Sequence, residues 1–156
     1  MKKIIIVVFV LIFLTGCKSD NEIDHLVRGK QYLSKMEYNS ALREFELGKN
    51  TYQSDANYYL AIAEITLKKG DPTKTLEVLH DGYTKTSSPQ IAIAIAGILL
   101  TEGDFSNSLI WFEKALSQDS TNIEALKGKI KILAVKNDTE GLEKFLKSID
   151  ISSYDS

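Results

Sequence analysis

Apolar and small residues recur along the chain with a period of 33 or 34 residues. The pattern is clearest in residues 103–116, which read Gly-Asp-Phe-Ser-Asn-Ser-Leu-Ile-Trp-Phe-Glu-Lys-Ala-Leu. Backward shifts align this stretch with Gly70-Asp71-Pro72 and then with Met36-Glu37-Tyr38, and a forward shift aligns it with Asn137-Asp138-Thr139. Four copies with helical apolar spacing inside each of them predict a helical solenoid.

Each copy carries signals for two helices joined by a tight turn. Gly70 and Gly103 suit the left-handed residue that closes a helix, and Asn137 is the best substitute for glycine there. The aspartate that follows each of them is predicted to cap the next helix, with Pro72 at a first helical position. The pattern predicts eight helices, near 22–35, 38–51, 55–69, 72–86, 89–102, 105–118, 122–136 and 139–149.

The second helix of each copy repeats three positions at helical spacing that suit close packing, because small residues let helices approach and large ones fill the gap. These positions are Ala41/Phe45/Gly48, Thr75/Leu79/Gly82, Ser108/Phe112/Ala115 and Leu142/Leu146/Ile149. Residues 91–96 alternate like a strand, but isoleucine alternates there with alanine rather than with polar residues. We therefore expect a buried helix at 91–96, with packing overriding β-propensity.

These positions resemble the consensus of the tetratricopeptide repeat (TPR) family, which has small, aromatic and small residues at these offsets. In the first helices, the residues that fit the family are Gly29, Tyr32, Tyr59, Ala63, Ile95 and Ala96. Arg28 and Lys129 stand where the family usually has leucine, and Ser120 replaces a frequent proline. The two charged departures fall in the terminal repeats, where one face of the array meets water.

The resemblance covers residues 22–149. It implies an all-α, right-handed solenoid of about four helix-turn-helix repeats, at 22–55, 56–88, 89–122 and 123–149. It also implies a binding scaffold, since this fold serves many unrelated clients.

In TPR arrays the concave groove is lined by the first helices. The resemblance therefore implies these groove residues: Leu26, Lys30, Leu60, Glu64, Ile93, Lys127 and Lys131. We expect Leu26, Leu60 and Ile93 to form an exposed aliphatic row, which tends to mark an interaction surface. A second row, Leu33, Leu67 and Leu100, fits either the groove or the ordinary core. The carboxylate clamp of some TPR domains is absent here, since its matching positions are Leu26, Ala61, Gln90 and Ala94. An apolar groove suits an amphipathic helix or an extended apolar peptide.

The first 17 residues resemble a bacterial lipoprotein signal. Two lysines precede an apolar run at 4–14, which is typical of a secretory signal and too short for a membrane-spanning helix. The sequence Leu14-Thr15-Gly16-Cys17 resembles the lipobox, which implies cleavage of residues 1–16 and acylation of Cys17. A cysteine can also follow a signal core by chance, but Cys17 is the only cysteine and has no disulfide partner.

The residues after Cys17 bear on location. Family knowledge of such lipoproteins implies sorting to the periplasmic face of the outer membrane, because Lys18 rather than aspartate follows the cysteine. Residues 17–21 are expected to form a lipidated terminus with a short tether. The four residues 18–21 of this tether reach about 14 Å when fully extended. Residues 150–156 are expected to form a flexible tail. Without Lys2 and Lys3, the chain has 17 basic and 21 acidic side chains. This net negative charge argues against a nucleic-acid partner.

The sequence contains few residues that suggest catalysis or the binding of a metal or cofactor. His25 and His80 lie in different copies and are expected to be isolated, and no metal, cofactor, phosphate loop or catalytic motif is predicted. We expect a non-enzymatic, membrane-anchored protein-interaction scaffold that assists assembly or stability of an envelope complex, such as a pilus or secretion system. Two alternatives stay open. One is a self-associating structural or regulatory subunit, and the other is an accessory of a cell-wall or polysaccharide enzyme.

Overall fold

The computed structural model describes residues 24–149, which fold into eight helices without a strand. The helices are α2 (His25–Ser34), α3 (Tyr38–Thr51), α4 (Ala56–Lys68), α5 (Pro72–Thr86), α6 (Pro89–Thr101), α7 (Phe105–Gln118), α8 (Ile123–Val135) and α9 (Thr139–Ser148). None of them is long and apolar enough to cross a membrane. The predicted signal peptide, Cys17, the tether and the tail at 150–156 lie outside the described residues.

The helix bounds lie within three residues of those predicted from the sequence. The largest difference is at the first helix, which begins at His25 because the Asp24 side chain accepts hydrogen bonds from the backbone N–H of Leu26 and Val27. Residues 91–96 are helical inside α6, and five of these six residues are buried. Packing therefore overrides their strand-like alternation, as predicted.

The turn inside each hairpin has a left-handed residue, as predicted for Gly70, Gly103 and Asn137. Its φ is +77° at Gly70, +80° at Gly103 and +55° at Asn137, and Met36 takes the equivalent place in the first hairpin with a φ of +61°. The aspartate after each of the last three turns caps the next helix, with Asp71 accepting from Lys74 N, Asp104 from Asn107 N and Asp138 from Gly141 N. Glu37 makes no such side-chain cap.

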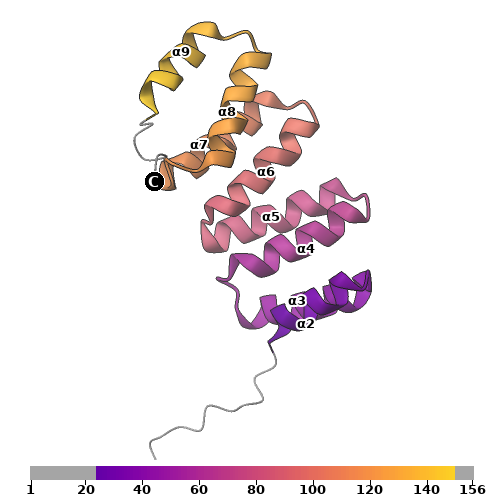
Figure 1. The fold of residues 1–156 in the computed structure, drawn as a ribbon. Coiled ribbons are helices and arrows are strands. Elements are labelled where there is room, and N and C mark those ends of the chain that lie inside the picture. The colour runs from indigo at the N-terminus through magenta and orange to yellow at the C-terminus, as the bar shows by residue number, and fades with distance from the viewer. Residues whose placement is uncertain (1–23, 150–156) are drawn as a thin grey trace, which may run out of the picture.

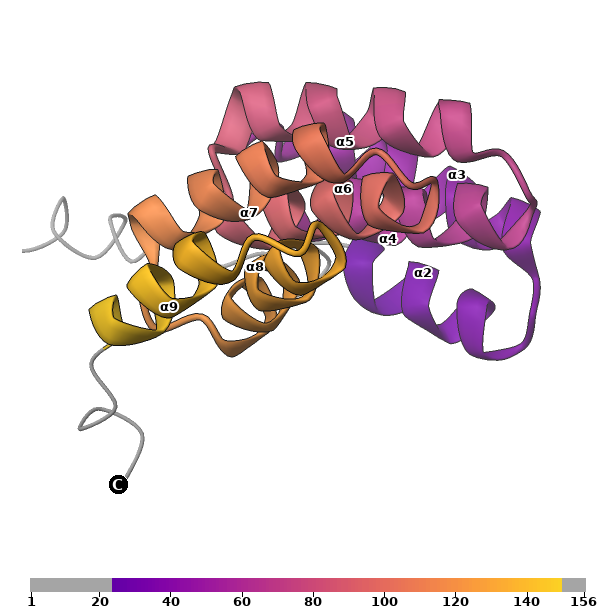
Figure 2. The same ribbon diagram turned by 90° about the horizontal axis from the view of Figure 1, so that it is seen from above.

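The helices pair in sequence order into four hairpins, and each hairpin packs on the next. The stack runs from α2 and α3 at one end, in indigo and purple, to α8 and α9 at the other, in orange and yellow (Figure 1). Figure 2 shows the same order from above, with α5, α7 and α9 following one another across the molecule. The arrangement is the predicted all-α helical-repeat solenoid.

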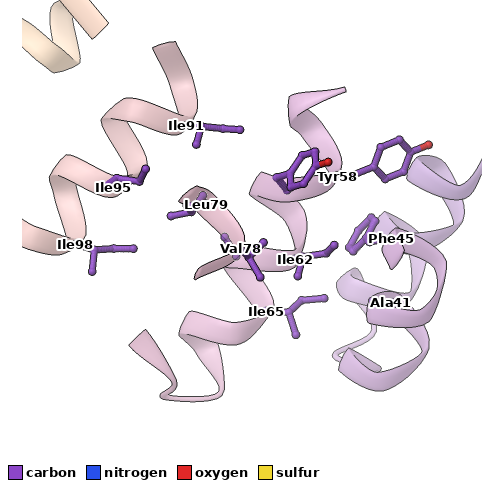
Figure 3. Packing of buried hydrophobic residues seen from close by; sticks show 12 residues of the cluster. Ala41, Phe45, Tyr58, Ile62, Ile65, Val78, Leu79, Ile91, Ile95 and Ile98 are labelled. Carbon is purple, nitrogen blue, oxygen red and sulfur yellow. The ribbon is translucent and has the colours of Figure 1, made fainter. Parts of the chain in front are cut away.

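The predicted packing positions of α3, α5 and α7 form the core. Phe45, Leu79 and Phe112 are at most 3% exposed, and their small companions are also buried. One buried cluster runs from α3 to α6 and a second joins α6, α7 and α8. Figure 3 shows the first cluster, which extends from Ile91 and Ile95 through Leu79 and Ile62 to Phe45.

The fourth copy differs from the other three. No residue of α9 is buried, and Leu146, in register with Phe112, is 47% exposed. No further helix of the described chain packs over it. The expectation that Leu146 fills an interhelical gap is therefore wrong, because the next hairpin that would form that gap is missing from residues 24–149.

Candidate functional site

A groove of about 400 Å³ lies between α4 and α6, the first helices of the second and third hairpins. Most of its surface is apolar. Its lining residues are Leu60, Ala63, Glu64, Leu67, Thr75, Leu79, Ala94, Gly97, Ile98 and Thr101. Two predicted groove residues, Leu60 and Glu64, are among them. The structure thus brings part of the predicted surface together in one apolar depression.

The polar groups of the groove are already partnered. The Thr75 hydroxyl lies 2.8 Å from that of Thr66 and donates to the carbonyl of Asp71 at 2.7 Å. The Thr101 hydroxyl donates to the carbonyl of Ile98 at 2.7 Å. Glu64 forms an ion pair with Lys68, with 3.7 Å between carboxylate oxygen and Nζ. The side chains of the groove therefore offer a ligand mainly apolar contact and no free hydrogen-bond donor, while Glu64 and the hydroxyl oxygens can still accept.

Gly97 lies at the middle of the α6 wall. A Cβ atom built there would have no atom within 4 Å, and its φ is not positive. The other glycines of 24–149 have a visible structural reason: a side chain would meet an aromatic ring at Gly29, Gly48, Gly82 and Gly128 and a carboxylate at Gly141, and φ is positive at Gly70 and Gly103. Gly97 is thus the described glycine that leaves open space without serving a turn or a packing contact.

The predicted aliphatic row is not uniformly exposed. Leu26 and Leu60 are half-buried and pack against the first core cluster. Ile93 is only 7% exposed, because it belongs to the second cluster with Ala125 and Ile132 of α8. The prediction of an exposed groove residue is therefore wrong for Ile93. In the second row, Leu67 is 50% exposed and lines the groove, whereas Leu33 and Leu100 are partly buried against the core.

The charged residues predicted for this face are all exposed: Lys30, Glu64, Lys127 and Lys131. Lys127 and Lys131 take the places on α8 that Ile93 and Gly97 take on α6. Neither lysine has an ion pair or hydrogen bond with another residue of the described chain. Within residues 24–149, α8 therefore presents two positive charges without an ion-pair partner, at the repeat positions of Ile93 and Gly97.

Comparison with known proteins gives a fold but no sequence family. No protein-family model matches the chain, and no curated protein matches it by sequence. Among solved structures, a tetratricopeptide repeat protein from Parabacteroides merdae superposes with a TM-score of 0.65 at 10% identity, covering 83% of this chain and 52% of that one. The chain has the TPR fold. It spans about half the length of the Parabacteroides protein.

Two further solved structures of this fold are described in terms of peptide binding. YrrB, a TPR protein with an unusual peptide-binding site, superposes with a TM-score of 0.59 at 19% identity, covering 76% of this chain and 62% of its own. SycD, the type III secretion chaperone of Yersinia enterocolitica, was solved with a peptide of the translocator YopD. It superposes with a TM-score of 0.58 at 14% identity, covering 80% of this chain and 92% of its own.

Arg28 and Lys129, the two charged departures from the TPR consensus, each form an ion pair with a glutamate of a neighbouring helix. Arg28 lies 3.3 Å from the buried carboxylate of Glu44, which also accepts a hydrogen bond from His25 Nδ1 at 2.8 Å. Lys129 pairs with Glu113 at 2.7 Å. The expectation that His25 is isolated is therefore wrong. Sequence reasoning missed the contact because its partners are 19 residues apart and meet only when α2 packs on α3.

An aromatic cluster joins α5 to α7 in this TPR array. Trp111 contacts Tyr83 edge-on at 4.9 Å and His80 at 5.1 Å between ring centroids, and Lys114 Nζ lies 3.7 Å from the Trp111 ring centre. Burial against this cluster lowers the pKa of His80, and the Lys114 charge lowers it further. Trp111 packs between hairpins, against both core clusters. No group of three or more His, Cys, Asp or Glu side chains in 24–149 is arranged to hold a metal ion.

Proposed function

We propose that this protein is a non-enzymatic interaction scaffold that binds a segment of a protein partner in the α4–α6 groove. The observation that carries the proposal is the groove itself, which is open, apolar and formed by the first helices of two successive TPR hairpins. The peptide-binding site described for YrrB and the peptide bound to SycD support it by analogy of fold. The only titratable side chain of the groove, Glu64, is paired with Lys68, so no acid–base or nucleophilic pair is available there.

We further propose that the scaffold is held at the periplasmic face of the outer membrane by acyl chains on Cys17. The support is sequence alone: the lipobox-like run before Cys17 and the lysine after it. Two or three acyl chains on one residue suffice for stable anchoring. A short tether would then keep the array near the bilayer, so the partner belongs to an envelope complex at the same membrane.

The groove can be tested with a matched pair of surface substitutions. Leu67 lines the groove and Ile110 lies on α7 outside it, yet both are aliphatic and 50% exposed. Leu67 is a better site for this test than Leu60, because Leu60 also packs against the core and a charged residue there would destabilise the fold. We expect Leu67→Glu to remove the partner and Ile110→Glu to keep it, because the new charge cannot be desolvated in an apolar contact.

The measurement is crosslinking in intact membranes followed by mass spectrometry, with helicity and thermal midpoint recorded for both variants. Loss of the same crosslinked partner in both variants would assign the effect to surface charge in general. Retention of all partners by Leu67→Glu would place binding outside the α4–α6 groove.

A further inference from the structure

We infer that the occupant of the α4–α6 groove is an amphipathic helix, whose apolar ridge crosses Gly97 and whose flank toward α8 is acidic. This inference rests on the proposed function, because it assumes that the groove binds a partner. It goes further by choosing between a helical and an extended ligand. Three features of the groove support that choice: its lack of free hydrogen-bond donors, its length, and the open space at Gly97.

The first feature concerns backbone hydrogen bonds. An extended segment buries N–H and C=O groups that need partners, and unpaired ones are unfavourable in an apolar site. The hydroxyls of Thr75 and Thr101 already bond to carbonyls of their own helices, and Glu64 is paired with Lys68. The backbones of α4 and α6 at the groove are satisfied within the helices. A helical ligand brings its backbone hydrogen bonds with it and needs none from the groove.

The second feature is the length of the groove. Its lining extends from Leu60 to Leu67 on α4 and from Ala94 to Thr101 on α6. Seven residue steps of an α-helix span about 10 Å, or two turns. A ligand helix of two turns presents three to four apolar side chains on one face at i, i+3, i+4 and i+7. The groove therefore matches the short apolar ridge of one helix.

The third feature is Gly97, which sits at the middle of the α6 wall. Glycine is less favourable than alanine inside a helix, and no internal contact excludes a side chain at this place. A missing side chain lets the backbone of a second helix approach closely, as small residues do at helix crossings. We assign Gly97 as the crossing point of the ligand helix.

Charge sets the character of the ligand's flank. Lys127 and Lys131 on α8 are exposed and have no partner among residues 24–149. They belong to α8, which packs against α6, and they occupy the repeat positions that Ile93 and Gly97 occupy on α6. Acidic side chains on the flank of the ligand that faces α8 would neutralise them. Such exposed pairs add selectivity and salt dependence more than affinity.

The test uses three synthetic 18-residue peptides, each with one photoreactive leucine in its apolar ridge. The first is a model amphipathic helix with leucines at i, i+3, i+4 and i+7 and glutamates on its flanks. The second has the same composition with a proline at its centre, which breaks the helix. The third carries lysines in place of the glutamates. Each is photolysed with the full chain in lipid nanodiscs, and mass spectrometry maps the labelled residues.

We expect the first peptide to label α4 and α6, and the proline and lysine peptides to label them at least several-fold less. High salt should remove the difference between the glutamate and lysine peptides. Gly97→Leu should reduce labelling at least tenfold. Gly97→Ala should reduce it several-fold while raising the thermal midpoint by a few degrees, so the loss cannot come from unfolding.

Other outcomes overturn the inference and leave the proposed function to its own test. Equal labelling by the proline peptide would show that the groove takes an extended segment. Unchanged labelling of Gly97→Leu would remove Gly97 from the contact. If no peptide labels α4 or α6, the helical occupant is rejected, while the Leu67→Glu experiment still decides whether the groove binds a partner.

Discussion

The ring of Phe112 on α7 fills the space that a side chain at Gly128 of α8 would occupy, since a Cβ atom built on Gly128 would overlap Cζ of the ring. This relationship locks the third hairpin to the fourth. The ring of Phe45 on α3 lies against Gly29 of α2 in the same manner and locks the helices of the first hairpin. Each ring is buried and neither glycine has a positive φ, so packing rather than turn geometry explains these two glycines.

The first prediction follows from that contact. Gly128→Ala should lower the free energy of unfolding by about 1–3 kcal/mol, because the added methyl group overpacks a well-filled core. Gly97→Ala is the matched control, because its methyl group meets no atom, and it should raise the stability by about 0.5–1 kcal/mol. Urea unfolding followed by circular dichroism measures both. Stabilisation by both substitutions would mean that Phe112 moves aside at little cost.

The second prediction concerns the left-handed turns. Met36 has a φ of +61°, which is unfavourable for a side chain with a Cβ atom, so Met36→Gly should raise the stability by about 1 kcal/mol. Gly103→Val should do the opposite and lower it by well over 1 kcal/mol, because a β-branched residue is forced to a φ near +80°. Thermal unfolding of the two variants gives both values. A neutral Gly103→Val would show that the turn readily changes its conformation.

The third prediction concerns pH. Burial against Trp111, together with Lys114, lowers the pKa of His80 from its usual 6.5. As the pH falls through this value, the unfolded chain takes up a proton that the folded chain still refuses, so stability decreases from pH 7 toward pH 5. His80→Gln should flatten this decrease in urea unfolding at pH 7, 6 and 5. Equal slopes in the variant and the parent protein would show that His80 does not contribute to the decrease.

The fourth prediction concerns the membrane anchor. Cys17→Ser should abolish labelling with radioactive palmitate, and the protein should accumulate as an unprocessed precursor or leave the membrane fraction, because its proposed lipid site is gone. Cell fractionation and the mass of the amino-terminal peptide measure this. Lys18→Asp is a useful companion, since it should keep the lipid and change the membrane to which the protein is sorted. Normal processing of Cys17→Ser would contradict the anchor.

The sequence was sufficient for the fold, because each hairpin carries local signals that do not depend on its neighbours. Gly103 and Asp104 mark one turn, and the spacing of Ser108, Phe112 and Ala115 marks one packed face. The groove was harder to predict, because exposure depends on which hairpin lies above a residue. Ile93 and Leu60 occupy equivalent positions in the repeat, yet α8 covers Ile93 whereas Leu60 remains at the groove.

Two features escaped prediction for physical reasons. The contact of His25 with Glu44 joins two helices and leaves no periodic trace in the sequence. Gly97 was visible as a glycine inside a helix, but its meaning came only from the empty space beside it in the folded array. A mid-helix glycine at the position where other repeats carry Lys30, Glu64 and Lys131 was the signal that could have marked the centre of the groove.

Because Leu146 on α9 is exposed, we expect local unfolding of residues 24–149 to start at the fourth hairpin. Repeat arrays derive their stability from the interface of each repeat with its neighbours, and α9 gains burial from one side only. Amide hydrogens of α9 should therefore exchange with solvent well before those of α4 and α6, through local unfolding that begins at the last hairpin. Local unfolding of the fourth hairpin would leave α4 and α6 folded. Ligand binding in the α4–α6 groove and the local stability of α9 can therefore change independently.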